Sequence, residues 1–98
     1  MQTYVIERKI PGAGKLTPGD LQAIARKSCD VLDQLGKDVR WRQSFVTADT
    51  IFCIYDARNE QLVREHARRG GFPADRVLPV ASIMTPDTAK GAPGTATG

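Results

Sequence analysis

The order of strand-like and helix-like stretches is the feature of this sequence that most restricts its fold. Runs of β-favouring residues cover 3–10, 39–47, 50–57 and 76–84. Apolar residues at helical spacing lie between Thr17 and Gly36 and again between Asn59 and Gly70. In this order a β-α-β unit occurs twice in succession, which predicts an α+β, ferredoxin-like βαββαβ sandwich with an antiparallel sheet. Two helices would cover one sheet face, and we expect the chain to dimerise through the open face.

Local residue chemistry places the ends of these elements. Thr17, Pro18 and Asp20 form a capping-box pattern that predicts a helix start. The turn between the second and third runs leaves their register open: a two- or four-residue loop sets Cys53 opposite Ser44, and a three-residue loop sets it opposite Gln43. A proline at position 79 favours an edge position for the last strand, because proline has no N–H for the ladder.

The length of 98 residues fits one domain, which we place at residues 1–84. From residue 85 to 98 the chain is rich in Pro, Gly, Thr and Ala, and we expect a flexible tail there. A domain of this size buries only about 60 to 65 percent of its unfolded surface, so hiding a second face in a homodimer would add stability.

Charge and cysteine content exclude several classes of function. Fourteen Lys and Arg against eleven Asp and Glu give a net charge of +3, which is too small to indicate nucleic-acid binding. The RNA-recognition signature and the phosphate-binding loop are both incomplete. No leader peptide and no apolar run of about 18 residues is apparent, so we expect neither export nor a membrane partner. Two cysteines outside any paired motif favour a reduced, cytoplasmic protein.

A small set of donor side chains could bind a transition metal. His66 is the single histidine, Glu65 precedes it, and Cys53 and Glu7 lie on predicted strands. Imidazole, thiolate and carboxylate together suit nickel, zinc or copper better than magnesium or calcium. Two alternatives remain open at this point: His66 as a buried structural residue on the apolar stripe of its helix, or Cys53 and His66 as a nucleophile and its base.

Several stretches resemble a small bacterial family, formerly described only as a domain of unknown function, that includes a nickel-binding, nickel-responsive protein. They are Tyr4-Val5-Ile6-Glu7-Arg8, Pro11-Gly12-Ala13-Gly14, Leu16-Thr17-Pro18, Trp41 with Ser44-Phe45-Val46-Thr47, Cys53-Ile54-Tyr55, and Glu65-His66-Ala67 through Gly70-Gly71-Phe72-Pro73. The resemblance covers about residues 1–87. It implies a ferredoxin-like homodimer, with nickel as the cofactor in at least one member.

Carried over onto this chain, the resemblance implies Glu7, Cys53, Glu65 and His66 as metal ligands. Gln43 stands where metal-binding relatives would have His or Glu, and glutamine is a poorer ligand than either. We therefore predict a cytoplasmic nickel-binding or nickel-responsive protein without assigned catalytic residues. The alternative is a small dimeric α/β-barrel enzyme that handles an organic substrate in an apolar pocket lined by Tyr4, Trp41, Tyr55 and His66.

Overall fold

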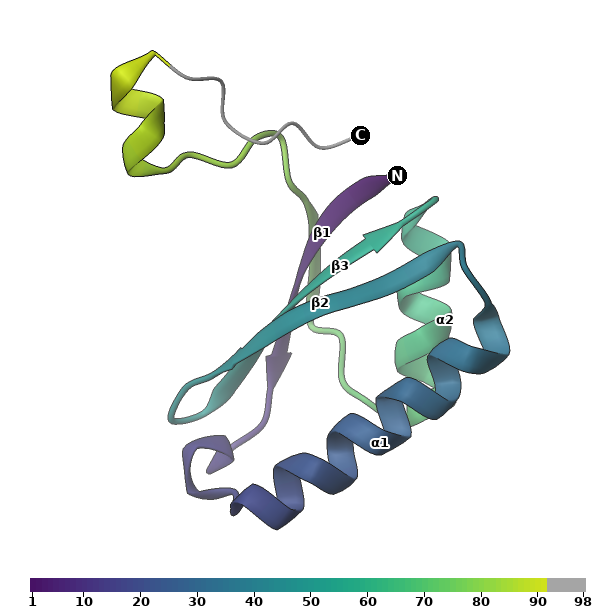
Figure 1. Cartoon of the computed structure of the whole chain (residues 1–98). Helices are drawn as coiled ribbons and strands as arrows, with labels where there is room; N and C mark the ends of the chain where they lie inside the picture. Colours follow the sequence, from purple (N-terminus) through teal and green to yellow (C-terminus); the bar gives the residue numbers. More distant parts are fainter. Residues whose placement is uncertain (92–98) are drawn as a thin grey trace.

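The computed structural model describes residues 1–91 and has the predicted strand and helix order (Figure 1). Four strands form one antiparallel sheet in the order β2-β3-β1-β4. They are β1 (Gln2–Lys9), β2 (Val39–Val46), β3 (Thr50–Ala57) and β4 (Arg76–Pro79). The two α-helices are α1 (Pro18–Leu35) and α2 (Glu60–Gly70), and two short 3-10 helices are η1 (Ala13–Lys15) and η2 (Pro86–Lys90). The ferredoxin-like α+β prediction is confirmed.

Side-chain caps fix where both α-helices begin. The Thr17 hydroxyl accepts a hydrogen bond from the Asp20 amide at 3.1 Å, and the Asp20 carboxylate accepts one from the Thr17 amide at 3.0 Å. The Asn59 side chain accepts the Leu62 amide at the start of α2. Each cap satisfies a backbone N–H that has no partner within the helix. The capping-box prediction for the first helix is therefore confirmed.

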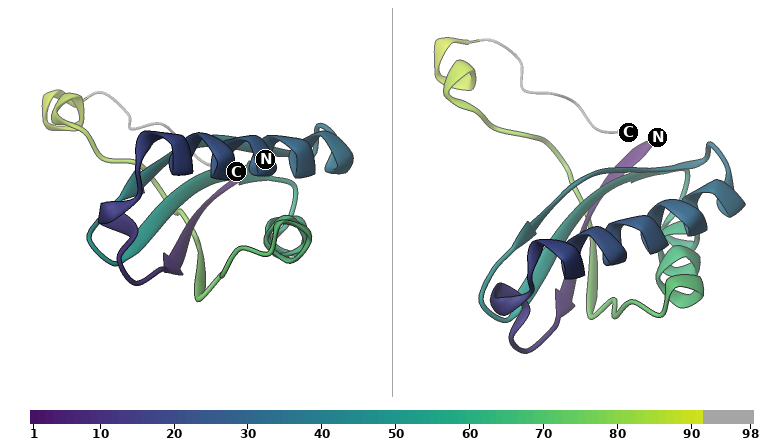
Figure 2. Two further views of the ribbon diagram at one scale, coloured as in Figure 1. Left: turned by 90° about the horizontal axis from the view of Figure 1, so that it is seen from below. Right: turned by 60° about the horizontal axis from the view of Figure 1, so that its bottom comes forward.

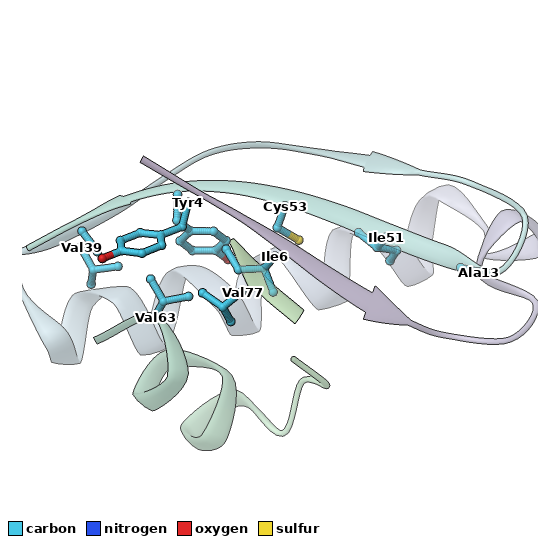
Figure 3. Packing of buried hydrophobic residues seen from close by; sticks show 10 residues of the cluster. Tyr4, Ile6, Ala13, Val39, Ile51, Cys53, Val63 and Val77 are labelled. Atoms are coloured by element: carbon cyan, nitrogen blue, oxygen red, sulfur yellow. The ribbon is translucent and has the colours of Figure 1, made fainter. Parts of the chain in front are cut away.

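Alternation along the strands places one set of side chains against the helices. Tyr4 and Ile6 of β1 and Cys53 and Tyr55 of β3 are buried on this side, together with Val63 of α2. Figure 3 shows Ile6, Cys53 and Val63 within the same layer between sheet and helices. Successive strand residues point to opposite faces, so Val5, Glu7, Phe52 and Ile54 lie on the face without helices.

The two helices cover the sheet unequally. Helix α1 has 18 residues and α2 has 11, and in both views of Figure 2 the shorter helix lies beside the C-terminal half of α1. The N-terminal half of α1 therefore faces the sheet without α2 beside it. This asymmetry positions the cavity described below.

The register of the β2–β3 hairpin is now fixed. Ser44 pairs with Cys53, the register expected for a two- or four-residue loop, and a bulge lies between Trp41 and Gln43. Because the bulge adds one residue to β2, Trp41 and Ser44 both lie on the helix side of the sheet while Gln43 lies on the open side.

The C-terminal part differs from the sequence prediction. The last strand ends at Pro79 instead of continuing to residue 84, although the Val80 amide just after it still donates to the Thr3 carbonyl oxygen at 2.9 Å. Within the predicted tail 85–98, residues Pro86–Lys90 form η2, which stands away from the sheet in Figure 1. Residues 92–98 lie outside the described part, so tail flexibility stays a prediction. Within residues 1–91, no helix has both the length and the apolar character needed to cross a bilayer.

Candidate functional site

A buried arginine lies near the C-terminal end of β1, on the helix side of the sheet. Arg8 is only 3% exposed, and its Nε donates to the Cys53 Sγ at 3.3 Å. Its Nη1 donates to the Pro73 carbonyl oxygen at 2.5 Å, and the guanidinium lies 5.5 Å from the centroid of the Phe72 ring. Nη2 has no hydrogen-bond partner in the described structure, and within residues 1–91 no carboxylate forms an ion pair with Arg8.

A chain of neutral polar groups lies next to this cation. The Ser28 hydroxyl is 3.0 Å from His66 Nε2 and 3.2 Å from the Tyr55 hydroxyl. Burial, and secondarily the positive charge of Arg8, lowers the pKa of His66 to about 4, so the imidazole is neutral at pH 7. Burial likewise raises the pKa of the Tyr55 phenol. The His66 ring is packed between Tyr55 and Phe72, and among the described residues its Nδ1 has no hydrogen-bond partner.

A cavity of about 230 Å³ lies between the N-terminal half of α1 and the sheet. Leu21, Ile24 and Ala25 of α1 form its apolar wall. Trp41, Tyr55 and Phe72 supply aromatic surface, and the polar lining residues are Arg8, Ser28, Ser44, Cys53 and Tyr55. Of the pocket residues predicted from sequence, Trp41 and Tyr55 line this cavity, whereas Tyr4 and His66 are buried outside its lining.

The four predicted metal ligands lie in three different places. Cys53 and His66 are buried on the helix side, at 5% and 0% exposure. Glu7 lies on the open face, where its carboxylate is 3.7 Å from the Arg76 guanidinium. Glu65 is on the outside of α2 and accepts hydrogen bonds from Arg68 and Arg69, which lower the pKa of its carboxyl to about 2.

This placement does not fit one metal ion within one protomer. Across residues 1–91, no group of three or more His, Cys, Asp or Glu side chains is close enough to hold a metal. The guanidinium beside the Cys53 Sγ would also repel a dication at that thiol. A complete site would therefore need further donors, from water, other residues or a second subunit, and the four ligands stay predictions.

Sequence reasoning selected Glu7 and missed its neighbour Arg8. The pattern Tyr4-x-Ile6-x-Arg8 has period two, so it places Arg8 on the same face as two core residues. A charged residue at such a position is rarely fully buried unless it is paired. A charged residue on the core face of a strand was therefore the signal in the sequence that could have identified Arg8 as a candidate site residue.

The fold and cavity define a small α+β protein with a ferredoxin-like sheet and a cationic group buried at the wall of an apolar pocket. Comparison with protein families gives a match over residues 4–80 to the family described as nickel-responsive protein, SCO4226-like. The chain belongs to this family, which confirms the resemblance seen in the sequence. The crystal structure of SCO4226 from Streptomyces coelicolor A3(2) is similar in fold, with a TM-score of 0.71 and 18% identity over 84% of this chain and 99% of that one. A search of curated proteins finds no match.

Proposed function

We propose that this protein binds nickel and takes part in a nickel response as a homodimer in the bacterial cytoplasm. The observation that carries the proposal is the family match over residues 4–80, because the family is described as nickel-responsive. The free thiols of Cys29 and Cys53 are compatible with a reducing compartment.

The open sheet face supports the homodimer. Its centre is apolar and partly exposed, with Phe45 at 53% and Leu78 at 41% exposure beside Val5, Phe52 and Ile54. Polar groups surround this apolar centre, including the Glu7–Arg76 pair and Gln43. A contiguous apolar patch with a polar rim is typical of a protein–protein contact. A second copy of this chain is the partner we propose for it.

The open face is also the favoured location for nickel. Glu7 is the predicted ligand on this face, and a second copy docked there would bring its own Glu7 and the Gln43 amides to the same interface. Cys53 and His66 face the other way, and Glu65 is held by two arginines. These three remain predicted ligands, but a metal would have to displace Arg8 from Cys53 or the arginines from Glu65, and the one His66 nitrogen without a partner among the described residues, Nδ1, is fully buried.

Calorimetric titration of the reduced, metal-free protein with nickel tests the proposal, with zinc as a second metal. Removing a residue that only hydrogen-bonds to a metal ligand weakens metal binding about 10- to 100-fold. Glu7→Gln removes a direct ligand, so it should weaken nickel binding by more than about tenfold. Cys53→Ser, Glu65→Gln and His66→Ala test the other three ligands. Glu60→Gln, at an exposed glutamate paired with Arg64, is the matched control and should bind as the unmodified protein does.

Absence of nickel binding would contradict the proposed function. Nickel binding that survives Glu7→Gln but disappears in Cys53→Ser or His66→Ala would contradict the open-face location.

The second candidate function is that of a small enzyme or binding protein acting on an organic molecule. The cavity of about 230 Å³ favours it, because Trp41 and Tyr55, two of the residues expected in such a pocket, line it. Its walls are mainly apolar with a few polar groups, which is the usual composition of a small-molecule site.

A further inference from the structure

We propose that the cavity on the helix side of the sheet binds a small organic monocarboxylate, with its apolar body in the cavity and its carboxylate on Arg8. The inference rests on the second candidate function, since it takes an organic molecule to be the occupant, and it specifies the chemistry of that molecule. It is independent of nickel binding at the open face.

The first step concerns the charge at the cavity wall. Among the described residues that line the cavity, Arg8 is the only charged one, and it is 3% exposed. A guanidinium keeps its proton at every physiological pH, so it cannot escape burial by becoming neutral. An uncompensated buried charge destabilises the fold, and buried charges are therefore normally paired. No carboxylate within residues 1–91 pairs with this one.

The second step concerns the unused hydrogen-bond donors. A guanidinium has five N–H groups, and here one on Nε and one on Nη1 are engaged, by Cys53 and by the Pro73 carbonyl. Nη2 engages none of the described residues. A carboxylate is the partner that matches this planar donor geometry, since it can accept two N–H groups of one guanidinium.

The third step concerns the size and polarity of the ligand. A dry apolar cavity of about 150 Å³ holds benzene, so about 230 Å³ accommodates a somewhat larger body. Leu21, Ile24 and Trp41 offer that body apolar contact, whereas the hydroxyls of Ser28 and Ser44 are the smaller part of the lining. A medium-chain alkanoate or a small aryl carboxylate combines the required apolar volume with one negative charge.

Octanoate and 1-octanol provide a direct test, because they share an alkyl chain and differ in head-group charge. Binding to the metal-free protein is followed by calorimetry and by the fluorescence of Trp41, the single tryptophan, which lines the cavity. A hydrogen bond to a charged group predicts that octanoate binds about tenfold to hundredfold more tightly than octanol. Arg8→Met should reduce octanoate affinity to the octanol level and leave octanol affinity unchanged.

Two further variants keep the test decisive. Arg8→Lys retains the positive charge but lacks the planar guanidinium, so it should give an octanoate affinity between those of the unmodified protein and Arg8→Met. It replaces Arg8→Met in the test if circular dichroism shows that Arg8→Met does not fold. Arg26→Met removes the same charge from an exposed position on α1 and should bind octanoate normally. Equal affinity for octanoate and octanol would overturn the carboxylate assignment while leaving the second candidate function intact. If neither octanoate nor octanol binds, the carboxylate assignment and the second candidate function are both overturned. If Arg8→Met binds octanoate as tightly as the unmodified protein does, the role of Arg8 is overturned.

Discussion

His66 illustrates how a single residue's surroundings decide its chemistry. The sequence alone allowed a metal ligand, a catalytic base or a structural residue. In the structure its ring is completely buried, bonded to Ser28 and packed between Tyr55 and Phe72. These contacts account for a neutral imidazole that contributes to the core, and a metal could reach its Nδ1, unpaired within residues 1–91, only if the packing around the buried ring opened.

The lowered pKa of His66 predicts a loss of stability in acid. The unfolded imidazole takes up a proton near pH 6.5, whereas the folded one does so near pH 4, so the unfolded state binds more protons between these values. The His66 contribution is therefore complete above pH 6.5 and is lost as pH falls towards 4. We expect the free energy of unfolding, measured by urea unfolding, to fall between pH 7.5 and pH 4.5. The fall should be roughly 2 to 3 kcal/mol larger for the unmodified protein than for His66→Phe. Equal losses in both proteins would contradict the buried neutral imidazole.

At the scale of elements, the exit from α2 is sterically constrained. Gly70 ends the helix and the Phe72 ring lies directly over it, so that a Cβ at position 70 would overlap the ring. The same Phe72 ring packs on His66 and Arg8 and lines the cavity. The Gly-Gly-Phe-Pro sequence therefore couples the end of a helix to the cavity wall.

Gly70→Ala should displace Phe72 and destabilise the fold by about 1 to 3 kcal/mol, the usual effect of overpacking. Gly19→Ala is the matched control, because its Cβ would meet nothing nearer than the Thr17 hydroxyl oxygen at 3.8 Å. That substitution should be neutral or stabilise α1 by up to about 1 kcal/mol. Thermal unfolding of both variants measures the difference, and equal melting temperatures would be inconsistent with the tight contact at Gly70.

The elements were largely predictable from the sequence because their determinants are local. Thr17 and Asn59 cap helices within their own turns, and strand alternation needs only neighbouring residues. The candidate site was less predictable because it depends on pairing between distant segments. Glu7 and Cys53 looked like joint ligands until the β1–β3 register placed Glu7 opposite Phe52 and Cys53 opposite Ile6, hence on opposite faces. Arg8 gains its role through Cys53 on β3 and Pro73 after α2, and Ser28 gains its role only when α1 packs on the sheet.

At the scale of the whole molecule, the two faces of the sheet differ in what they can bind. The helix side encloses a buried cation and an apolar cavity, which suits an organic anion. The open side has exposed apolar side chains and the Glu7 carboxylate, which suits a second subunit and a metal cation. A dication bound at the proposed open-face site would thereby be kept on the opposite side of the sheet from the Arg8 guanidinium.

Phe45 is the most direct probe of the proposed dimer. It is 53% exposed in the single chain, so Phe45→Glu should have little effect on the stability of a monomer. If two copies pack through the open face, the same change buries a carboxylate at the interface and should convert a dimer into monomers of 10.7 kDa. Sedimentation equilibrium distinguishes these states, with Phe45→Leu as the control that stays dimeric. A dimer that survives Phe45→Glu would be evidence against this interface.

X-ray absorption spectroscopy of the nickel-loaded protein tests the central claim most directly, because it identifies the atoms bound to the metal. Nickel held at the open face by Glu7 and its dimer mate should show oxygen neighbours without sulfur, since Cys53 and the single histidine, His66, lie on the other side of the sheet. A sulfur neighbour would place nickel at a cysteine, either Cys53 next to the Arg8 guanidinium or the exposed Cys29, and would contradict this account.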